Sequence, residues 1–116
     1  MQIAKDLEGW KGSGVRGIDL PCGEEAAPVQ VARAHMLQAS PRYLLINTGN
    51  ANAGTGARGI DAANACCDAV ARAADVDSQQ VLPFSTGVIG EHLPVDLIEA
   101  ALPAAFASLS DNSWAA

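Results

Sequence analysis

Two short apolar runs have the pattern of strands buried in a core. Residues 43–46 (Tyr-Leu-Leu-Ile) lie between Ser-Pro and an Asn- and Gly-rich stretch, and residues 81–84 (Val-Leu-Pro-Phe) stop at Ser85-Thr86-Gly87. Apolar runs of this length between turn-forming residues are typical of strands. We therefore predict strands at 43–46 and 81–84, the first followed by a loop over residues 47–56 and the second ending at Ser85-Thr86-Gly87.

Helical spacing marks two further stretches. Between Gly59 and Ala74 small and apolar residues recur every three to four positions while polar residues share the opposite side, which is the pattern of an amphipathic helix. A second helix is expected to start at Pro94, a residue favoured in the first helical turn, and Pro103 should end or kink it. The order strand, helix, strand, helix indicates an α/β fold.

The first 25 residues show no periodic pattern and hold five of the eleven glycines, so we expect a loop or a poorly specified edge there. The character of the chain changes at Ala26. Residues 27–31 alternate like a strand, and residues 32–38 could follow as a short helical turn. We accordingly divide the chain into an irregular region, 1–25, and a folded part, 26–116.

The composition indicates a thin core. Apolar residues make up 49% of the 116, but 23 of them are alanines, which bury little area each. A chain of this size must bury roughly two-thirds of its unfolded surface to be stable. We therefore expect the fold to depend on a partner surface or on further chain.

The charge pattern excludes several classes of function. The net charge is −6, and residues 59–116 carry one basic and eight acidic side chains. A chain without a Lys/Arg cluster lacks the usual surface for nucleic acid or anionic lipid. Apolar runs fall far short of the ~20 residues of a membrane span, and no export signal opens the sequence. We expect a soluble protein of the cytoplasm that binds neither nucleic acid nor membrane.

The cysteines give no sign of a disulfide framework or a metal site. There are three, Cys22, Cys66 and Cys67, and no histidine stands at ligand spacing from them. Free cysteines are often interior, so we expect small packing side chains with at least one of the adjacent pair buried, in a reducing compartment. We expect neither a metal nor a bound cofactor.

The stretch 47–56 (Asn-Thr-Gly-Asn-Ala-Asn-Ala-Gly-Thr-Gly) is rich in residues that tolerate positive φ. It could line a site, or its amides could simply satisfy a tight structural turn. Residues 54–59 also match Gly-x-Gly-x-x-Gly, the pattern of a dinucleotide-binding turn. That match is weak, because six residues separate Asn47 from Gly54 and the next strand ends in Ser85 where an acidic residue is expected.

Ser85-Thr86-Gly87 presents a hydroxyl and a backbone N–H side by side, a pair that could hold a developing oxyanion. Many strands end in such residues for reasons of turn formation alone. A nucleophilic Ser85 or Thr86 would need a base, and His35 and His92 show no triad spacing. Glu91 beside His92 fits a solvated surface pair better than an acid–base dyad.

Three stretches together resemble the ornithine acetyltransferase family: Ala26-Ala27-Pro28-Val29, the Asn- and Gly-rich stretch 47–56, and Ser85-Thr86-Gly87-Val88-Ile89-Gly90-Glu91 with Leu93-Pro94. The resemblance covers about residues 26–116. It implies a glutamate N-acetyltransferase of arginine biosynthesis that moves acetyl from N-acetylornithine to glutamate. Many members also make N-acetylglutamate from acetyl-CoA.

The resemblance also implies a mechanism and a partner. The precursor cuts itself into two chains, which form a four-layer αββα sandwich, and the N-terminal threonine of the second (β) chain is the nucleophile. The oxyanion donors of the family fall on Thr86 and Gly87. The family's Ala-Thr cleavage junction is absent from these 116 residues. We therefore expect an incomplete domain, a fragment of the first (α) chain that is inactive by itself.

Two other hypotheses stay open at this point. Residues 54–59 could make the chain a small nucleotide-binding module, which dialysis against NAD or ATP would test. The alanine-rich, thin core would also suit a non-catalytic remnant without activity of its own.

Overall fold

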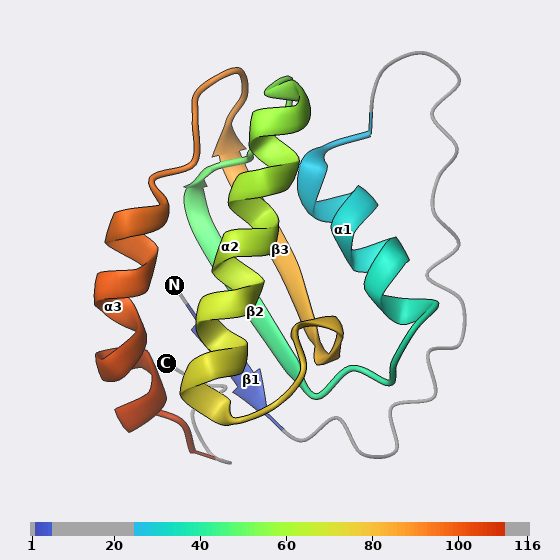
Figure 1. Cartoon of the computed structure of the whole chain (residues 1–116). Coiled ribbons are helices and arrows are strands. Elements are labelled where there is room, and N and C mark those ends of the chain that lie inside the picture. The colour runs from blue at the N-terminus through green and yellow to red at the C-terminus, as the bar shows by residue number, and fades with distance from the viewer. Residues whose placement is uncertain (1, 6–24, 111–116) are drawn as a thin grey trace.

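The computed structural model describes residues 2–5 and 25–110 (Figure 1). The elements in chain order are β1 (Gln2–Lys5), α1 (Ala27–Met36), β2 (Tyr43–Asn50), α2 (Gly56–Ala74), a 3-10 turn (Ser78–Gln80), β3 (Val81–Val88) and α3 (Val95–Ala107). The strands form one sheet in the order β1-β2-β3. β1 is antiparallel to β2, whereas β2 and β3 are parallel and joined by α2 as a crossover helix.

The three helices pack on the same face of the sheet (Figure 1). One core joins Val31 of α1, Val70 of α2 and Ile98 of α3 to Tyr43 and Leu45 of β2. Side chains alternate between the two faces of a strand, so residues 44 and 46 of β2 point to the other face. The described residues thus build two layers, one of helices and one of sheet, consistent with a partial sandwich of the predicted α/β class.

The predicted amphipathic helix is confirmed as α2, which begins three residues earlier, at Gly56. Its buried face carries small side chains: Ala63, Cys66 and Cys67 are at most 1% exposed. Small residues allow a close approach of helix and sheet. The helix ends at Asp75, which adopts the left-handed conformation (φ +55°) common after a last helical turn.

Both core strands run past the ends predicted for them. β2 continues to Asn50 and β3 to Val88, because residues 47–50 pair in register with 85–88 in a parallel ladder. The prediction that the loop begins at residue 47 is therefore wrong for residues 47–50, and so is the prediction that the second strand ends at residue 84. Pairing between distant segments decides these ends, and polarity along the chain does not report it.

Residues 27–31 form the first half of helix α1 and not a strand. The buried residues of α1 are Ala27, Pro28, Val31, Ala32 and His35, which share one face of a helix. The alternation of Val and Gln over five residues is too short to separate the two periods. Pro28 in the first turn is a helix signal, since its missing N–H is not needed there.

The ends of the chain differ in part from the predictions. Gln2–Lys5 form the edge strand β1, which pairs with β2, so the region 1–25 is not irregular at these four residues. Residues 6–24, Cys22 among them, lie outside the described part. Of the two effects expected of Pro103, an end and a kink, the first is wrong, because α3 continues to Ala107. No helix in the described ranges is long and apolar enough to cross a membrane.

Candidate active site

The carboxyl ends of β2 and β3 bring the two polar motifs together. Parallel strands end at the same edge of a sheet, the usual place for ligands in α/β folds. In the register of this pair, Thr48 lies beside Thr86 and Gly49 beside Gly87. Two stretches almost forty residues apart in sequence therefore form one surface.

Gly87 fits this position because it is glycine. Its φ is +129°, a conformation that other residues rarely adopt, and a Cβ built on it would lie 2.4 Å from the carbonyl carbon of Gly49. Its partner Gly49 also has a positive φ, +114°, but a Cβ there would meet nothing within 4 Å. The backbones of β2 and β3 thus approach closely at Gly87.

The ladder fixes the direction in which Gly87 presents its N–H. The carbonyl groups of Gln80 and Val88 accept from N–H groups at the two ends of β2, those of Arg42 and Ala51. Backbone groups alternate in direction along a strand, so the even-numbered residues of β3 face β2 and the odd-numbered ones face away. The N–H of Gly87 therefore points to the open side of β3, next to the exposed Thr86.

Asparagine side chains form hydrogen bonds with the segments on either side of Thr86 and Gly87. Asn50 donates through Nδ2 to the carbonyl oxygens of Glu91 (3.2 Å) and His92 (3.1 Å), and its Oδ1 accepts from the N–H of Asn52 (2.7 Å). On the helix side of the sheet, Ser85 donates its hydroxyl to Oδ1 of Asn47. The end of β2 is therefore bonded both to β3 and to the segment that follows β3.

Asn52 is the buried centre of the loop. It is 0% exposed and has a φ of +48°. Its Nδ2 donates to the carbonyl of Gly59 (2.8 Å), and its Oδ1 accepts from the hydroxyl of Thr55 (2.9 Å). A Cβ on Gly59 would lie 1.8 Å from the Thr55 hydroxyl and 2.7 Å from Oδ1 of Asn52, so the last glycine of the 54–59 motif makes room for this network.

A family model described as the ArgJ family matches residues 23–116. This match covers most of the chain.

The chain belongs to the ArgJ family.

Curated relatives agree with this assignment. The "arginine biosynthesis bifunctional protein ArgJ" of Methylococcus capsulatus is 60% identical over 91 residues, 78% of this chain and 22% of that protein. The protein of the same name from Pseudomonas syringae pv. tomato is 53% identical over 106 residues, 91% of this chain and 26% of that protein. The chain thus spans about a quarter of the length of these relatives.

Solved structures show the same fold. ArgJ of Bacillus halodurans superposes with a TM-score of 0.65 at 27% identity, covering 88% of this chain and 46% of that one. Ornithine acetyltransferase of Mycobacterium tuberculosis superposes with a TM-score of 0.71 at 24% identity, covering 95% of this chain and 52% of that one. The predicted family resemblance and the predicted partial sandwich are confirmed.

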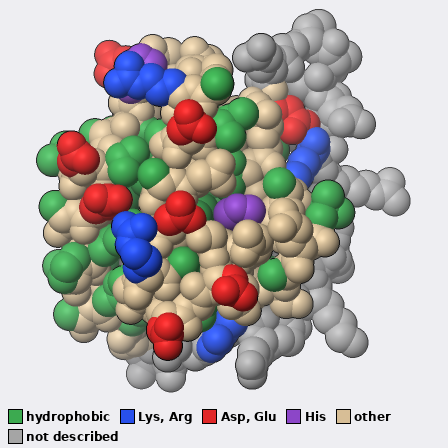
Figure 2. All heavy atoms as spheres, in the orientation of Figure 1, with side chains coloured by type: hydrophobic (Ala, Val, Ile, Leu, Met, Phe, Trp, Pro, Cys, Tyr) green, Lys and Arg blue, Asp and Glu red, His purple; other side chains and the backbone are tan. Residues whose placement is uncertain are grey.

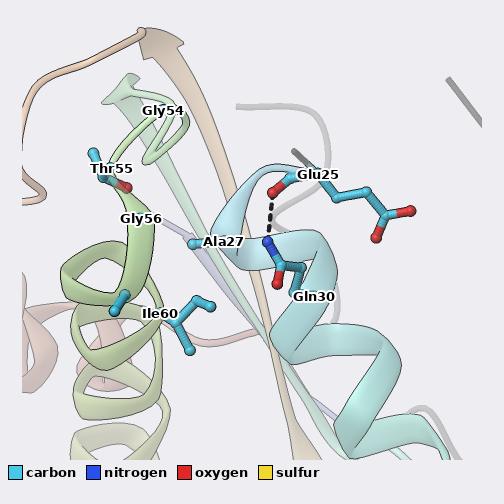
Figure 3. A pocket seen from close by; sticks show the side chains of 8 residues that line it. Glu25, Ala27, Gln30, Gly54, Thr55, Gly56 and Ile60 are labelled. Carbon is cyan, nitrogen blue, oxygen red and sulfur yellow. Dashed lines mark hydrogen bonds between the residues drawn. The ribbon is translucent and has the colours of Figure 1, made fainter. Parts of the chain in front are cut away.

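The Gly-x-Gly-x-x-Gly motif lies beside a cleft of about 460 Å³ between the N-terminal ends of α1 and α2 (Figure 3). Gly54, Gly56 and Gln30 line it, and Gln30 donates to the carbonyl of Glu25 (2.6 Å). The carboxylate of Glu25 is turned away, toward Arg33. No Lys or Arg belongs to the residues described as lining the cleft, so it offers a phosphate no compensating charge.

The other candidates from the sequence fall outside the edge formed by β2 and β3. His35 is buried and bonds through Nδ1 to the carbonyl of Val81 (2.8 Å), at the far end of β3 from Thr86. Glu91 and His92 are exposed, as expected of a surface pair. Charged side chains are scattered over the face shown in Figure 2, without a basic patch.

The cysteines of α2 are packing residues, as predicted, and both are free. Burial raises the pKa of the Cys66 thiol to about 11, with a smaller effect from the charge of Glu99. Burial also raises the pKa of Cys67 to about 12, with smaller effects from Cys66 and Asp68. Both thiols are therefore protonated and unreactive at neutral pH.

The sequence predicted Thr86 and Gly87 as candidates but gave no indication of the contacts of Asn50 and Asn52. For the stretch 47–56 it left two possibilities open, a site lining and a structural turn. The side chains of Asn50 and Asn52 bond to backbone groups and to Thr55. These contacts favour the structural turn for these two residues. The only signal in the sequence was the density of asparagine next to a strand end.

Proposed function

We propose that this chain supplies the oxyanion hole of an acetyltransferase that moves acetyl from N-acetylornithine to glutamate in arginine biosynthesis. The hydroxyl of Thr86 and the N–H of Gly87 are the donors. The observation that carries the proposal is their adjacency at the carboxyl end of β3, with the hydroxyl exposed and the N–H directed away from β2. Such donors stabilise charge that develops on a carbonyl oxygen.

The reaction proceeds in two steps, acetyl transfer to a threonine and acetyl transfer from it to glutamate. A threonine hydroxyl attacks the acetyl carbonyl of N-acetylornithine, the carbonyl oxygen becomes an oxyanion held by the two donors, and ornithine leaves with the proton taken from the hydroxyl. The amine of glutamate then attacks the acetyl-threonine ester, which gives N-acetylglutamate and restores the hydroxyl. The same donors serve both tetrahedral intermediates. In a bifunctional enzyme, acetyl-CoA is the second acetyl donor.

The nucleophile comes from outside this chain, from the N-terminal threonine of a second, β chain. The described residues support an external source, because Ser85 bonds to Asn47 and His35 bonds to Val81 at the other end of the strand. The relative from Methylococcus capsulatus is matched over 22% of its length, so most of that protein lies outside the segment that corresponds to this chain.

The open face of the sheet is the surface on which the rest of the enzyme packs. This face combines the polar carboxyl ends of β2 and β3 with apolar side chains. Leu44 and Ile46 are half-buried, and Phe84 is 43% exposed. A second sheet packed there would complete the αββα sandwich. We propose the cytoplasm as the compartment of the assembled enzyme.

The test is a chimera, in which the matched segment of this chain replaces its counterpart in Methylococcus ArgJ. Thr86→Val removes the hydroxyl and keeps the shape. We expect kcat for acetyl transfer to fall by about two to three orders of magnitude with little change in KM, as when one oxyanion donor is deleted. Ser108→Ala, which removes an exposed hydroxyl after the last turn of α3, is the control and should keep kcat within about threefold.

Equal activity of the Thr86→Val chimera and its parent would refute the oxyanion role. A chimera that folds but transfers no acetyl group at all would refute the wider proposal that this chain can serve the enzyme. It would favour a non-catalytic remnant.

A further inference from the structure

We propose that Asn50 is a positioning residue that holds Gly87 and the hydroxyl of Thr86 in the geometry required for the oxyanion. This inference rests on the function proposed above. It concerns how the site is held and assigns a role to the Asn- and Gly-rich stretch, which the proposed chemistry does not use.

The carboxamide of Asn50 uses both of its ends. Asn50 is the last residue of β2, and its Nδ2 donates to two successive carbonyl oxygens, those of Glu91 and His92, in the segment after β3. Its Oδ1 accepts from the N–H of Asn52, at 2.7 Å. One side chain therefore bridges the end of β2, its own loop and the segment that leaves the active edge.

Two backbone bonds act in the same direction. The N–H of Ala51 donates to the carbonyl of Val88 (2.9 Å), and the N–H of Gly90 donates to the carbonyl of Ala53 (2.8 Å). The parallel ladder fixes the backbone before Gly87, and these two bonds fix the backbone after it. Without the second set, the positive φ of Gly87 would be free to relax, since glycine has no side chain to restrict it.

The bridge is anchored in the core. Asn52, to which Asn50 is bonded, is fully buried and is tied by its side chain to the carbonyl of Gly59 at the start of α2. The carbonyl of Asn52 accepts from the N–H of Ala27, the first residue of α1 (3.2 Å). Through Asn52, Asn50 therefore links the segment after Gly87 to the N-terminal ends of α1 and α2.

An amide is needed at this position because one side chain must both donate and accept. Asn50→Asp keeps the shape and the acceptor but replaces the two donated bonds by contact between a carboxylate oxygen and two carbonyl oxygens. The segment 88–92 should then move away. Since oxyanion donors act mainly in the transition state, we expect kcat to fall about tenfold while KM for N-acetylornithine changes less than about twofold.

The experiment is a double-mutant cycle in the Methylococcus chimera, with kcat and KM measured for the parent, Asn50→Asp, Thr86→Val and the double variant. If Asn50 acts through the donor pair, its substitution should cost about tenfold beside Thr86 but less than about threefold beside Val. Asn64→Asp on α2 makes the same chemical change away from this edge and should leave kcat and KM at parental values.

The outcomes distinguish a failure of the proposed oxyanion role from a failure of the positioning role of Asn50. If Thr86→Val leaves kcat unchanged, the oxyanion role itself fails. If Thr86→Val lowers kcat but Asn50→Asp does not, or if the cost of Asn50→Asp is the same in both backgrounds, the positioning role alone is overturned. Should Asn50→Asp fail to fold, judged by its thermal unfolding, Asn50→Ala removes the same bonds without repulsion and must show the same dependence on Thr86.

Discussion

At the scale of single residues, Gly87 carries two separate requirements. Its φ of +129° costs any other residue conformational strain, and its missing side chain allows the backbone of Gly49 to come close. Gly49 has only the first requirement, because a Cβ there would be in open space. Comparing the same substitution at the two glycines therefore separates the cost of backbone strain from the cost of steric contact.

Gly87→Ala should therefore destabilise the chain more than Gly49→Ala. Strain at positive φ costs on the order of 1–3 kcal/mol in each case. The added methyl at residue 87 must also push β2 away, so we expect a further loss of about 1–3 kcal/mol, typical of overpacking. Urea unfolding of both variants measures the difference, and equal losses would show that the strands part without cost.

The residues of the site differ in how far the sequence could predict them. Thr86 and Gly87 could be proposed because a hydroxyl next to a glycine at a strand end is suggestive, and the resemblance to the family chose this interpretation over a turn. The role of Asn50 could not, because its partners, Glu91 and His92, lie some forty residues away and contribute only backbone carbonyls. Any sequence at 91 and 92 would offer the same acceptors.

At the scale of elements, long periodic segments were predictable and short ones were not. α2 has 19 residues, enough to establish a helical period, and its existence was predicted. α1 has ten, and its first five residues fit either period. The strand ends at Asn50 and Val88 depend on the register between β2 and β3, which no local pattern contains. The likeness to a family supplied the type of sandwich but neither α1 nor these strand ends.

The buried thiols of α2 predict how stability depends on pH. The pKa values of Cys66 and Cys67 are raised in the folded chain to about 11 and about 12, whereas both are near 9.0 when unfolded. Above pH 9 the unfolded state therefore loses protons that the folded state keeps. The stabilisation is complete below pH 9 and is lost as the pH rises through 11 and 12.

We expect the free energy of unfolding to fall between pH 8.5 and 11, and to fall less steeply in the variant Cys66→Ala/Cys67→Ala. Chemical unfolding at a series of pH values gives both slopes. Comparing slopes removes the constant cost of the smaller side chains and the titration of lysine and tyrosine, which the variants share. Parallel slopes for the double variant and the unmodified chain would mean that the thiols are not desolvated.

At the scale of the whole molecule, the two faces of the sheet differ toward the carboxyl ends of β2 and β3. The helical layer covers Tyr43 and Leu45 to 6% and 3% exposure, whereas on the other face Leu82 is 2% exposed and Phe84, two residues further along β3, is 43% exposed. The residues at the polar edge continue the same asymmetry, with Val88 52% and Ile89 72% exposed. Clustered exposed apolar residues are the mark of an interaction surface.

The open face predicts opposite effects of one substitution in two settings. Phe84→Thr keeps a residue suited to strands but removes apolar surface. In the 116-residue chain it should reduce self-association, whereas in the chimera it should lower the melting temperature, because there the ring is covered and burying such a side chain is worth about 1.5–3 kcal/mol. Leu37→Gln, at a position 89% exposed after α1, should have no effect on the chimera. Sedimentation of the chain and thermal unfolding of the chimera measure the two effects. A Phe84→Thr chimera that melts at the parental temperature would place the rest of the enzyme on another face.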